Sequence, residues 1–431
     1  MNNKIKLAVA GAVLSASSFA NAGIIIPAGD WTLDVNGNVN AFMQRVDVDK
    51  SEFGNAQGTI GVSEDGNGED TGWGMTTGLL PAWLGFTGTT NQNGIDVSFT
   101  ISLQTAVSDN GIHGDGSDGL GNQNTTVLNR QTFITFGTKD MGTVKIGKDL
   151  GIYASDAILS DMTLLGVGAG SYRNGTTQAT TFGGIGTGYQ YAAWKGQVAY
   201  TTPNMNGFQA TIGLVHPDAF MATARSTASE DAVSGVTTAG VNHVYQDRMG
   251  YEGKASYSWT GDIAGKVWVS GASYDVTGSN NATGANGDDV TISAWDIGAN
   301  ITSGNLGLVG YYYDGRGNGI TAFGLQGVVA DAAGTSFKKR DGDGGYVQAT
   351  YVIPTGTKLG LAYGVSNLDK SSADGAGAGL IDKQERWTVA AYHPLTKHLN
   401  LVAEYNDVQR ETHDNLENDY DSINLGAILF F

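Results

Sequence analysis

The sequence predicts an all-β protein, a transmembrane antiparallel β-barrel of about 16 strands. Three observations carry this prediction. Segments in which apolar and polar residues alternate recur along the chain, the links between them alternate between short and long, and the chain begins with an export-like segment. Gly accounts for 65 of the 431 residues and Pro for only 6, and Cys is absent. Stability therefore cannot come from a disulfide framework.

The first 22 residues have the three parts of a secretory signal peptide. Lys4 and Lys6 form a basic leader, an apolar stretch follows over 7–20, and small residues complete the segment. The apolar stretch is too short to span a bilayer as a permanent helix. We therefore expect residues 1–22 to be cleaved and residues 23–431 to form a single barrel domain.

Charge and hydropathy exclude several classes of protein. The formal net charge is −18, from 24 Lys and Arg against 42 Asp and Glu. Because phosphate binding needs basic patches, nucleic acid is not expected as a partner. No run of about 18 apolar residues follows the leader, which argues against transmembrane helices. The remaining classes are an outer-membrane barrel, a secreted β-solenoid and an extracellular binding protein.

Alternating segments predict the strands, and the C-terminal segment shows the pattern most clearly. One of its faces carries Ile423, Leu425, Ala427, Leu429 and Phe431, whereas the other is mostly polar. We expect this apolar face to meet lipid or a neighbouring subunit, and the segment to pair with the first strand. Candidate strands start near residues 31, 81, 95, 126, 142, 187, 207, 247, 265, 290, 305, 344, 357, 384, 397 and 420.

The links between these strands decide between a barrel and the other classes. Every second link is a short turn, and the others are long and polar, over 49–80, 107–125, 149–186, 217–246, 277–289, 315–343, 370–383 and 412–419. Short periplasmic turns and long extracellular loops are typical of an outer-membrane barrel. A β-solenoid would show a fixed short repeat, which the sequence lacks. An even number of strands places both termini on the turn side.

Charged residues within the strands are expected to face the lumen. A charge on the lipid face costs about 2 to 4 kcal/mol at the middle of the bilayer. The residues on the polar faces of their strands are Arg248, Glu252, Lys254, Arg386 and Glu404. Because sixteen strands enclose more space than side chains fill, these residues are expected to line a water-filled channel.

Three segments, at 82–104, 129–162 and 199–214, together with the terminal Phe431, resemble the Gram-negative trimeric general porins. The resemblance implies a homotrimer in the outer membrane whose third long loop, 149–186, folds into the lumen and narrows it. It implies that Arg130 and Lys148 are basic wall residues of this constriction and that Asp156 and Asp161 are its acidic loop residues. It also implies that Phe431 is read by the outer-membrane assembly machinery.

The sequence departs from that resemblance in three places. Trp83 and Ala199 stand where many members have an arginine, and the later part of the loop, 164–170, has no carboxylate. The transverse field of the constriction should therefore be weak. Trp83 is expected either to offer sugars or aromatic solutes a stacking surface in the pore, or to lie at the membrane interface or a subunit contact.

The function expected from these observations is passive diffusion of small hydrophilic solutes and ions, with a mild preference for cations because the chain is acidic. A solute-specific porin, and an adhesin or receptor that acts through its loops, are the alternatives. An enzyme is not expected, since no nucleophile-elbow motif is present. The acidic clusters lack calcium-loop spacing, so neither a metal nor a cofactor is expected, although loops that share cations with lipopolysaccharide are allowed.

Overall fold

The structure is a computed structural model of the chain. It describes residues 23–53, 70–107, 127–170, 180–216, 242–245, 248–280, 285–330, 337–375 and 380–431. The expected signal peptide, residues 1–22, lies outside the described residues, as do the central parts of several long loops.

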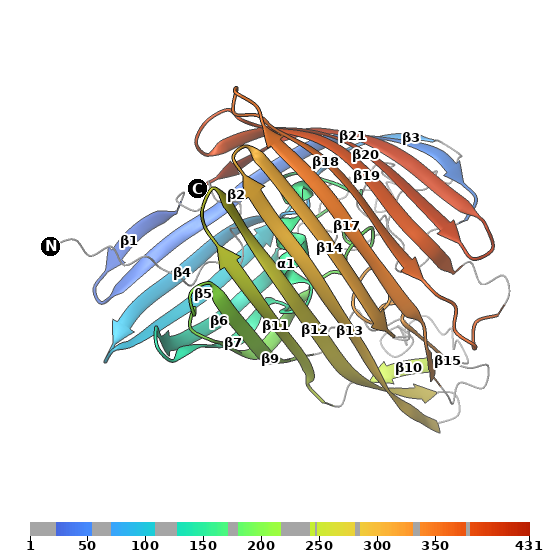
Figure 1. The fold of residues 1–431 in the computed structure, drawn as a ribbon, viewed down its shortest axis with the longest axis horizontal. Helices are drawn as coiled ribbons and strands as arrows, with labels where there is room; N and C mark the ends of the chain where they lie inside the picture. Colours follow the sequence, from blue (N-terminus) through green and yellow to red (C-terminus); the bar gives the residue numbers. More distant parts are fainter. Residues whose placement is uncertain are drawn as a thin grey trace.

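Sixteen antiparallel strands form a closed barrel (Figure 1). In the order in which they pair around the wall, they are β2 (Trp31–Ser51), β4 (Ala82–Gln92), β5 (Ile95–Thr105), β6 (Leu128–Thr138), β7 (Gly142–Leu150), β8 (Trp194–Thr201), β9 (Phe208–Val215), β11 (Gly250–Trp259), β12 (Ile263–Asn280), β13 (Ala285–Ser303), β14 (Leu306–Arg316), β17 (Asp341–Val352), β18 (Lys358–Leu368), β19 (Ile381–Pro394), β20 (Leu399–Thr412) and β21 (Glu417–Phe430). Because β21 pairs with β2, the wall has no open edge, as a bilayer requires.

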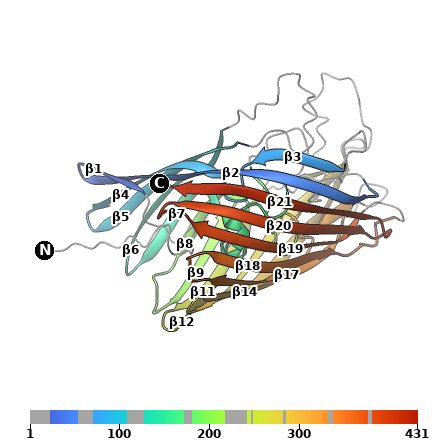
Figure 2. The ribbon, with the colours of Figure 1, turned by 90° about the horizontal axis from the view of Figure 1, so that it is seen from above.

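Additional short strands accompany this wall. β1 (Ile24–Ala28) forms a hairpin with the beginning of β2, and β3 (Thr71–Thr76) pairs with the later part of β2. β10 (Asn242–Tyr245) pairs with the end of β12. β15 (Val328–Ala330) and β16 (Phe337–Lys339) form a separate two-stranded sheet. β3 and β4 pair with successive parts of β2, and residues 77–81 leave the wall between them. β1 and the C-terminal residue lie at the same end of the barrel (Figure 2).

The expected architecture is confirmed, but three boundaries differ from the prediction. The strand expected from residue 187 begins at Trp194, because residues 185–191 are held by hydrogen bonds inside the barrel. Most of the loop expected at 277–289 is strand, since β12 and β13 pair as far as Asn280 and Ala285. The last expected loop, 412–419, is reduced to a turn over 413–416, closed by a 3.0 Å hydrogen bond from the Thr412 amide to the Leu416 carbonyl.

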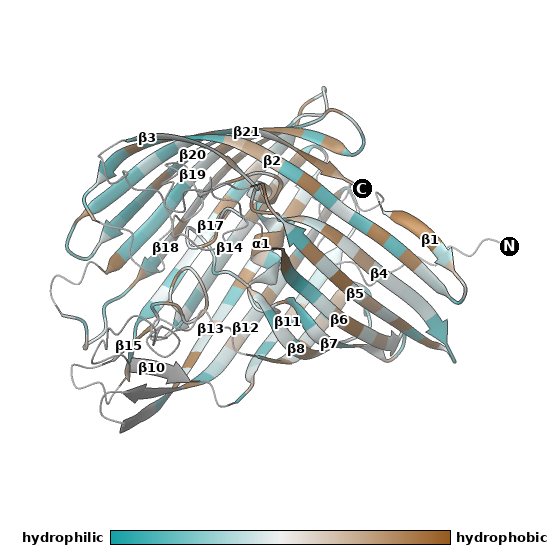
Figure 3. Ribbon diagram, turned by 180° about the vertical axis from the view of Figure 1, so that it is seen from behind, coloured by the Kyte–Doolittle hydropathy of each residue, from teal (hydrophilic) through white to brown (hydrophobic). Residues whose placement is uncertain are grey.

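Hydrophilic and hydrophobic residues follow one another along the strands of the wall (Figure 3), and their side chains lie on opposite faces. On β21 the side chains of Ile423, Leu425 and Leu429 are outward and exposed, whereas the intervening Asn424 and Ile428 are buried inside. Large apolar side chains are likewise exposed along the outer face of other strands, including Ile212, Val347 and Val389. Burying this outer band in lipid is what makes such a chain stable in a membrane. No helix among the described residues has the length and apolar character needed to cross a membrane.

Candidate functional site: the loop inside the barrel

The described residues of the connection between β7 and β8, 151–170 and 180–193, fold into the barrel, and we call them the inward loop. It contains the only α-helix among the described residues, α1 (Ser155–Ser160), followed by a short 3-10 helix (Met162–Leu165), and α1 lies within the barrel in Figure 1. Its apolar side chains pack against the inner face of the wall: Met162, Leu165 and Val167 meet β2 and β18–β21, whereas Ala157 and Ile158 meet β12, β14 and β17. The inward loop and one side of the wall therefore share apolar clusters inside the barrel.

Asp156, on α1, is held between two lysines of the wall. Its carboxylate contacts Lys254 on β11 at 3.0 Å and also pairs with Lys266 on β12. Burial alone would raise the pKa of Asp156, but the two ammonium groups outweigh that effect and hold the pKa below its usual value. The Lys254 and Lys266 side chains remain 19% and 33% exposed, compared with 9% for Asp156. One carboxylate therefore balances two cations that are still open to water.

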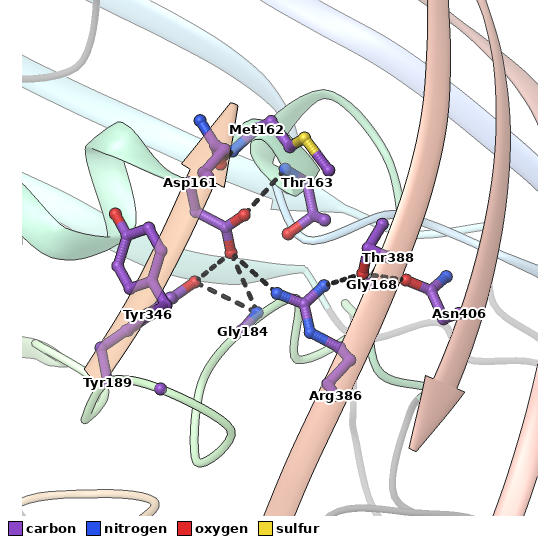
Figure 4. A network of polar contacts seen from close by, with 12 residues as sticks. Asp161, Met162, Thr163, Gly168, Gly184, Tyr189, Tyr346, Arg386, Thr388 and Asn406 are labelled. Carbon is purple, nitrogen blue, oxygen red and sulfur yellow. Dashed lines mark hydrogen bonds and ion pairs between the residues drawn. The ribbon is translucent and has the colours of Figure 1, made fainter. Parts of the chain in front are cut away.

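Asp161, which ends the turn after α1, is the centre of a buried polar network (Figure 4). It accepts hydrogen bonds from the Tyr189 hydroxyl at 2.8 Å and from the backbone amides of Thr163 and Gly184 at 2.9 and 3.0 Å. The guanidinium of Arg386 on β19 lies 3.8 Å from the same carboxylate. Arg386 also donates to Thr388 at 2.7 Å. The network joins the beginning and the end of the inward loop to the wall.

Two wall glutamates bind backbone amides of the inward loop. Glu404 accepts from the amides of Val167 and Gly168 at 2.7 and 3.0 Å, and from the Tyr392 hydroxyl at 2.7 Å. Glu252 accepts from the amides of residues 152 and 153 at 2.6 and 3.0 Å, and pairs with Lys195 at 2.8 Å. Carboxylates that accept amide hydrogen bonds hold a segment firmly, since removing one leaves buried donors without partners.

Most of the charged residues that were expected to line a water-filled lumen are instead buried against the inward loop. Glu252, Lys254, Arg386 and Glu404 all lie on the inner face, but Glu252, Arg386 and Glu404 are only 2 to 3% exposed. They hold the inward loop rather than face water. The alternation of strands identifies the face of a side chain, but not whether solvent or protein covers it.

Two expected site residues, Arg248 and Lys148, lie elsewhere, and a third, Arg130, contacts an aromatic ring of β8. Arg248 is at the exposed rim, 3.3 Å from Asp275 and 3.6 Å from Asp289, so its expected lumen-lining position is wrong. Lys148 is exposed on the face of β7 opposite to that of the paired Lys145 and Asp149, which contradicts its expected place on the pore wall. The Arg130 guanidinium lies over the ring of Trp194, 5.9 Å from its centroid.

Trp83 and Phe431 lie at the turn-side end of the barrel. Trp83 is half-buried on the inner face of β4, donates to the Asn36 amide oxygen at 3.3 Å, and packs edge-on against Phe430. Trp83 therefore lies inside the wall, and its expected role as a stacking surface for solutes stays a prediction. Phe431 follows β21, and its backbone forms hydrogen bonds with the backbone of Gly37 on β2.

The sequence reasoning missed several residues that hold the inward loop. Gln348 accepts a hydrogen bond from the Met162 amide at 2.7 Å. The Tyr420 hydroxyl accepts from the Gly170 amide at 3.0 Å, and Ser366 accepts from the Gly188 amide at 3.0 Å. Lys266 was also missed, although the alternation of β12 places it on the inner face with Trp268 and Ser270. That alternation is the signal that could have found it.

Some polar side chains on the inner face of the wall are only partly buried. They lie on strands from β4 to β12 and are Thr87, Thr100, Lys145, Thr211, Lys254 and Lys266. Hydroxyl and ammonium groups can bind water and small solutes reversibly. Among the described residues, no group of three or more His, Asp and Glu side chains is arranged to hold a metal ion.

Comparisons with known proteins agree with this arrangement. A family model described as Gram-negative porin matches residues 7–413. The outer membrane channel DcaP of Acinetobacter baumannii is 17% identical, with a TM-score of 0.64 over 95% of this chain and 100% of that chain. OmpF of Salmonella typhi, in a complex with daunomycin, is 16% identical, with a TM-score of 0.54 over 95% and 100% of the two chains. OmpT of Vibrio cholerae, in its trimer form, is 13% identical, with a TM-score of 0.51 over 93% and 99%. None of the curated proteins matches the sequence.

Proposed function

Because this chain belongs to the Gram-negative porin family and forms an outer-membrane channel, we propose that small hydrophilic solutes and ions diffuse through it passively. The observation that carries this proposal is the inward loop, which buried side chains of β11, β19 and β20 hold across the inside of a closed barrel. Such a barrel selects solutes by size and charge at its narrowest part, without covalent chemistry. A channel, rather than an enzyme, is what the family and the fold support.

We propose that the charged part of the constriction consists of Asp156, Lys254 and Lys266. These side chains meet where the inward loop approaches β11 and β12, and both lysines are partly open to water. Asp161 has a different role in this proposal, because it is buried among loop amides and Arg386. It shapes the constriction by positioning the loop. Trp83 is proposed to offer an aromatic surface on the turn side of the pore.

We propose that the channel has a mild preference for cations. The net charge of −18 makes its surroundings attractive to cations over about a Debye length. Lys254 and Lys266 oppose this effect at the constriction, because Asp156 balances only one of them. The preference should therefore be weak, and reversal potentials in a salt gradient would measure it. An anion preference would overturn this part of the proposal.

Single-channel recording in planar bilayers tests the main proposal. The purified protein should give stepwise, ohmic conductance, and small sugars should pass through it in a liposome-swelling assay. A folded barrel that stays silent and excludes sugars would contradict the channel and favour the alternative of an adhesin or receptor. Block of the current by one class of solute would instead favour a solute-specific porin.

We also propose that three copies of the chain assemble, as in the trimer form described for the similar OmpT. Insertion should then raise the conductance in groups of three equal steps. The terminal Phe431 is proposed to be read by the assembly machinery, and the outer rim to contact lipopolysaccharide. Removal of Phe431 should reduce membrane insertion more than it changes the conductance of the barrels that do insert.

A further inference from the structure

A second segment of the chain enters the barrel, from a loop that the sequence reasoning regarded as long, polar and external. Residues 317–327 follow β14, and all of them are buried, from Gly317 to Gly327. We call them the second segment. Four of its side chains, those of Ile320, Ala322, Phe323 and Leu325, are apolar and at most 8% exposed. An external loop would leave such side chains in water, so this segment is built to be enclosed.

Gln190 of the inward loop joins the two segments. Its side-chain amide donates to the carbonyls of Asn318 and Gly319 at 2.8 and 2.6 Å. Its amide oxygen accepts from the Tyr153 hydroxyl at 2.8 Å, at the other end of the inward loop. Both polar atoms of this fully buried side chain are therefore used. A buried amide with every partner in place fixes the position of the groups around it.

Backbone and aromatic contacts also join the inward loop to the second segment. The Tyr191 amide donates to the Thr321 carbonyl at 2.8 Å, and Tyr191 forms a parallel bridge with Ala322. The ring of Phe323 packs edge-on against Tyr153 of the inward loop and Tyr274 of β12, with centroids 5.5 and 4.6 Å apart. The second segment thus fills the space between the inward loop and the wall.

The second segment is also compact in itself. Gly319 has a φ of +67°, and a Cβ there would lie 1.8 Å from the Leu325 carbonyl oxygen. The Gly324 amide donates to the Asn318 carbonyl at 2.7 Å, which closes the segment on itself. A segment closed by its own hydrogen bonds keeps its shape when its neighbours move.

We propose that residues 317–327 are a second constriction element, which sets the width of the pore together with the inward loop and is coupled to it by Gln190. This inference rests on the proposed function, because it assigns the residues that limit the same channel. The inward loop alone leaves the space beside β12 and β13 to be filled, and Phe323 occupies it. Both loops must therefore hold their places for the pore to keep one width.

Two variants test the coupling, Gln190→Leu and Phe323→Ala. The first keeps the side-chain volume but removes the side-chain donor to the Gly319 carbonyl and leaves the Asn318 carbonyl bonded to the Gly324 amide. The second removes the ring between the inward loop and β12. Each should raise the single-channel conductance by up to about twofold, admit larger polymers and add noise to the open current. Gln409→Leu is the matched control, because Gln409 is exposed on β20, and it should conduct as the wild type does.

A cross-link keeps the inference testable if those variants fold poorly. The chain has no cysteine, so the pair Tyr191→Cys and Ala322→Cys would carry the only thiols. Bridge partners lie within the range that a disulfide spans, and mild oxidation should join them. The cross-linked barrel should conduct as the wild type does, because the bond fixes an arrangement that already exists.

The outcomes separate this inference from the function on which it rests. Wild-type protein that conducts, with variants of unchanged conductance, polymer cut-off and noise, would overturn the second constriction element and leave the channel intact. A double-cysteine protein that does not cross-link, or that conducts much less when it does, would also overturn it. Wild-type barrels that never conduct would overturn the channel itself, and this inference with it.

Discussion

The backbone of Gly37 forms two hydrogen bonds with the terminal Phe431. The Gly37 amide donates to the Phe431 carbonyl at 2.8 Å, and the Phe431 amide donates back at 3.0 Å. These bonds continue the pairing of β2 with β21 to the last residue and close the barrel. The apolar C-terminal segment, which in a soluble protein would fray, is therefore part of the seam between β2 and β21 that closes the wall.

Gly37→Val should impair barrel closure. A Cβ at this position would lie 2.7 Å from the Phe431 ring and 2.2 Å from the Trp83 carbonyl oxygen, so a larger side chain must displace the seam. Overpacking of this kind costs about 1 to 3 kcal/mol. Heat-dependent mobility on a denaturing gel should show a lower unfolding temperature and less folded barrel.

Gly310→Val is the matched control for this substitution. Gly310 lies on β14, where nothing is within 4 Å of an added Cβ, so the unfolding temperature should stay near that of the wild type. If both variants unfolded at the wild-type temperature, close packing at the seam would not contribute to stability.

Arg386→Met should loosen the inward loop. The substitution keeps an apolar stem but leaves the Asp161 carboxylate without the guanidinium 3.8 Å away. Removal of one partner from a buried pair costs about 3 to 5 kcal/mol, although hydrogen bonds from Tyr189 and two amides still hold Asp161. The barrel should still insert, with more noise in the open current.

The matched control for that variant is Arg45→Met. Arg45 pairs with Asp47 on β2, and its side chain is 36% exposed, so its loss should cost less than about 1 kcal/mol. Quiet, wild-type current from Arg386→Met would show that the other contacts of Asp161 suffice to hold the loop.

Alternation and link length predict the sixteen strands because lipid imposes them on every strand in the same way. The interior is different, since both water and an inward loop can cover a polar side chain. Glu404 and Lys254 look alike in sequence, yet one is buried beneath loop amides and the other is partly open. Which of the two applies depends on where the inward loop folds, and this is a tertiary property.

The sequences of two loops contain a pattern from which their burial could have been predicted. The segment 317–327 contains Ile320, Phe323 and Leu325, and the segment 77–81 contains Leu79 and Leu80. Both segments enter the barrel, where these side chains are buried. Length alone indicated external loops, whereas clustered large apolar residues indicated that part of each loop must be covered.

Lys266→Gln should shift the selectivity toward cations. The substitution removes one of the two ammonium groups beside Asp156, so the local charge of the three groups falls from positive to neutral. The reversal potential in a tenfold salt gradient should move in the direction of greater cation permeability. Lys397→Gln is the control, because Lys397 is exposed in the turn between β19 and β20. Equal shifts in the two variants would mean that overall charge, rather than this cluster, sets the selectivity.

Asp374→Asn should release the outer end of the second segment. Arg340 donates to the Gln326 carbonyl at 2.7 Å and to both oxygens of Asp374, at 3.0 and 2.6 Å. It thereby links the external loop after β18 to residues 317–327. At neutral pH the amide should bind Arg340 more weakly than the carboxylate does, because the charge is lost. Hydrogen exchange at the Gly327 amide should become faster, whereas Asp369→Asn, an exposed position of the same loop, should leave it unchanged.

The same link should resist acid. Burial alone would raise the pKa of Asp374, but hydrogen bonds from Arg340 and Ser371 outweigh it and lower the pKa from 3.8 to about 2. Because the pKa is lower in the folded protein, the stabilisation is complete above 3.8 and is lost as the pH falls through about 2. Exchange at Gly327 in the wild type, corrected for the intrinsic effect of pH, should therefore stay slow from neutral pH to about pH 4 and increase only below it. An increase already near pH 5 would show that another group carries the link.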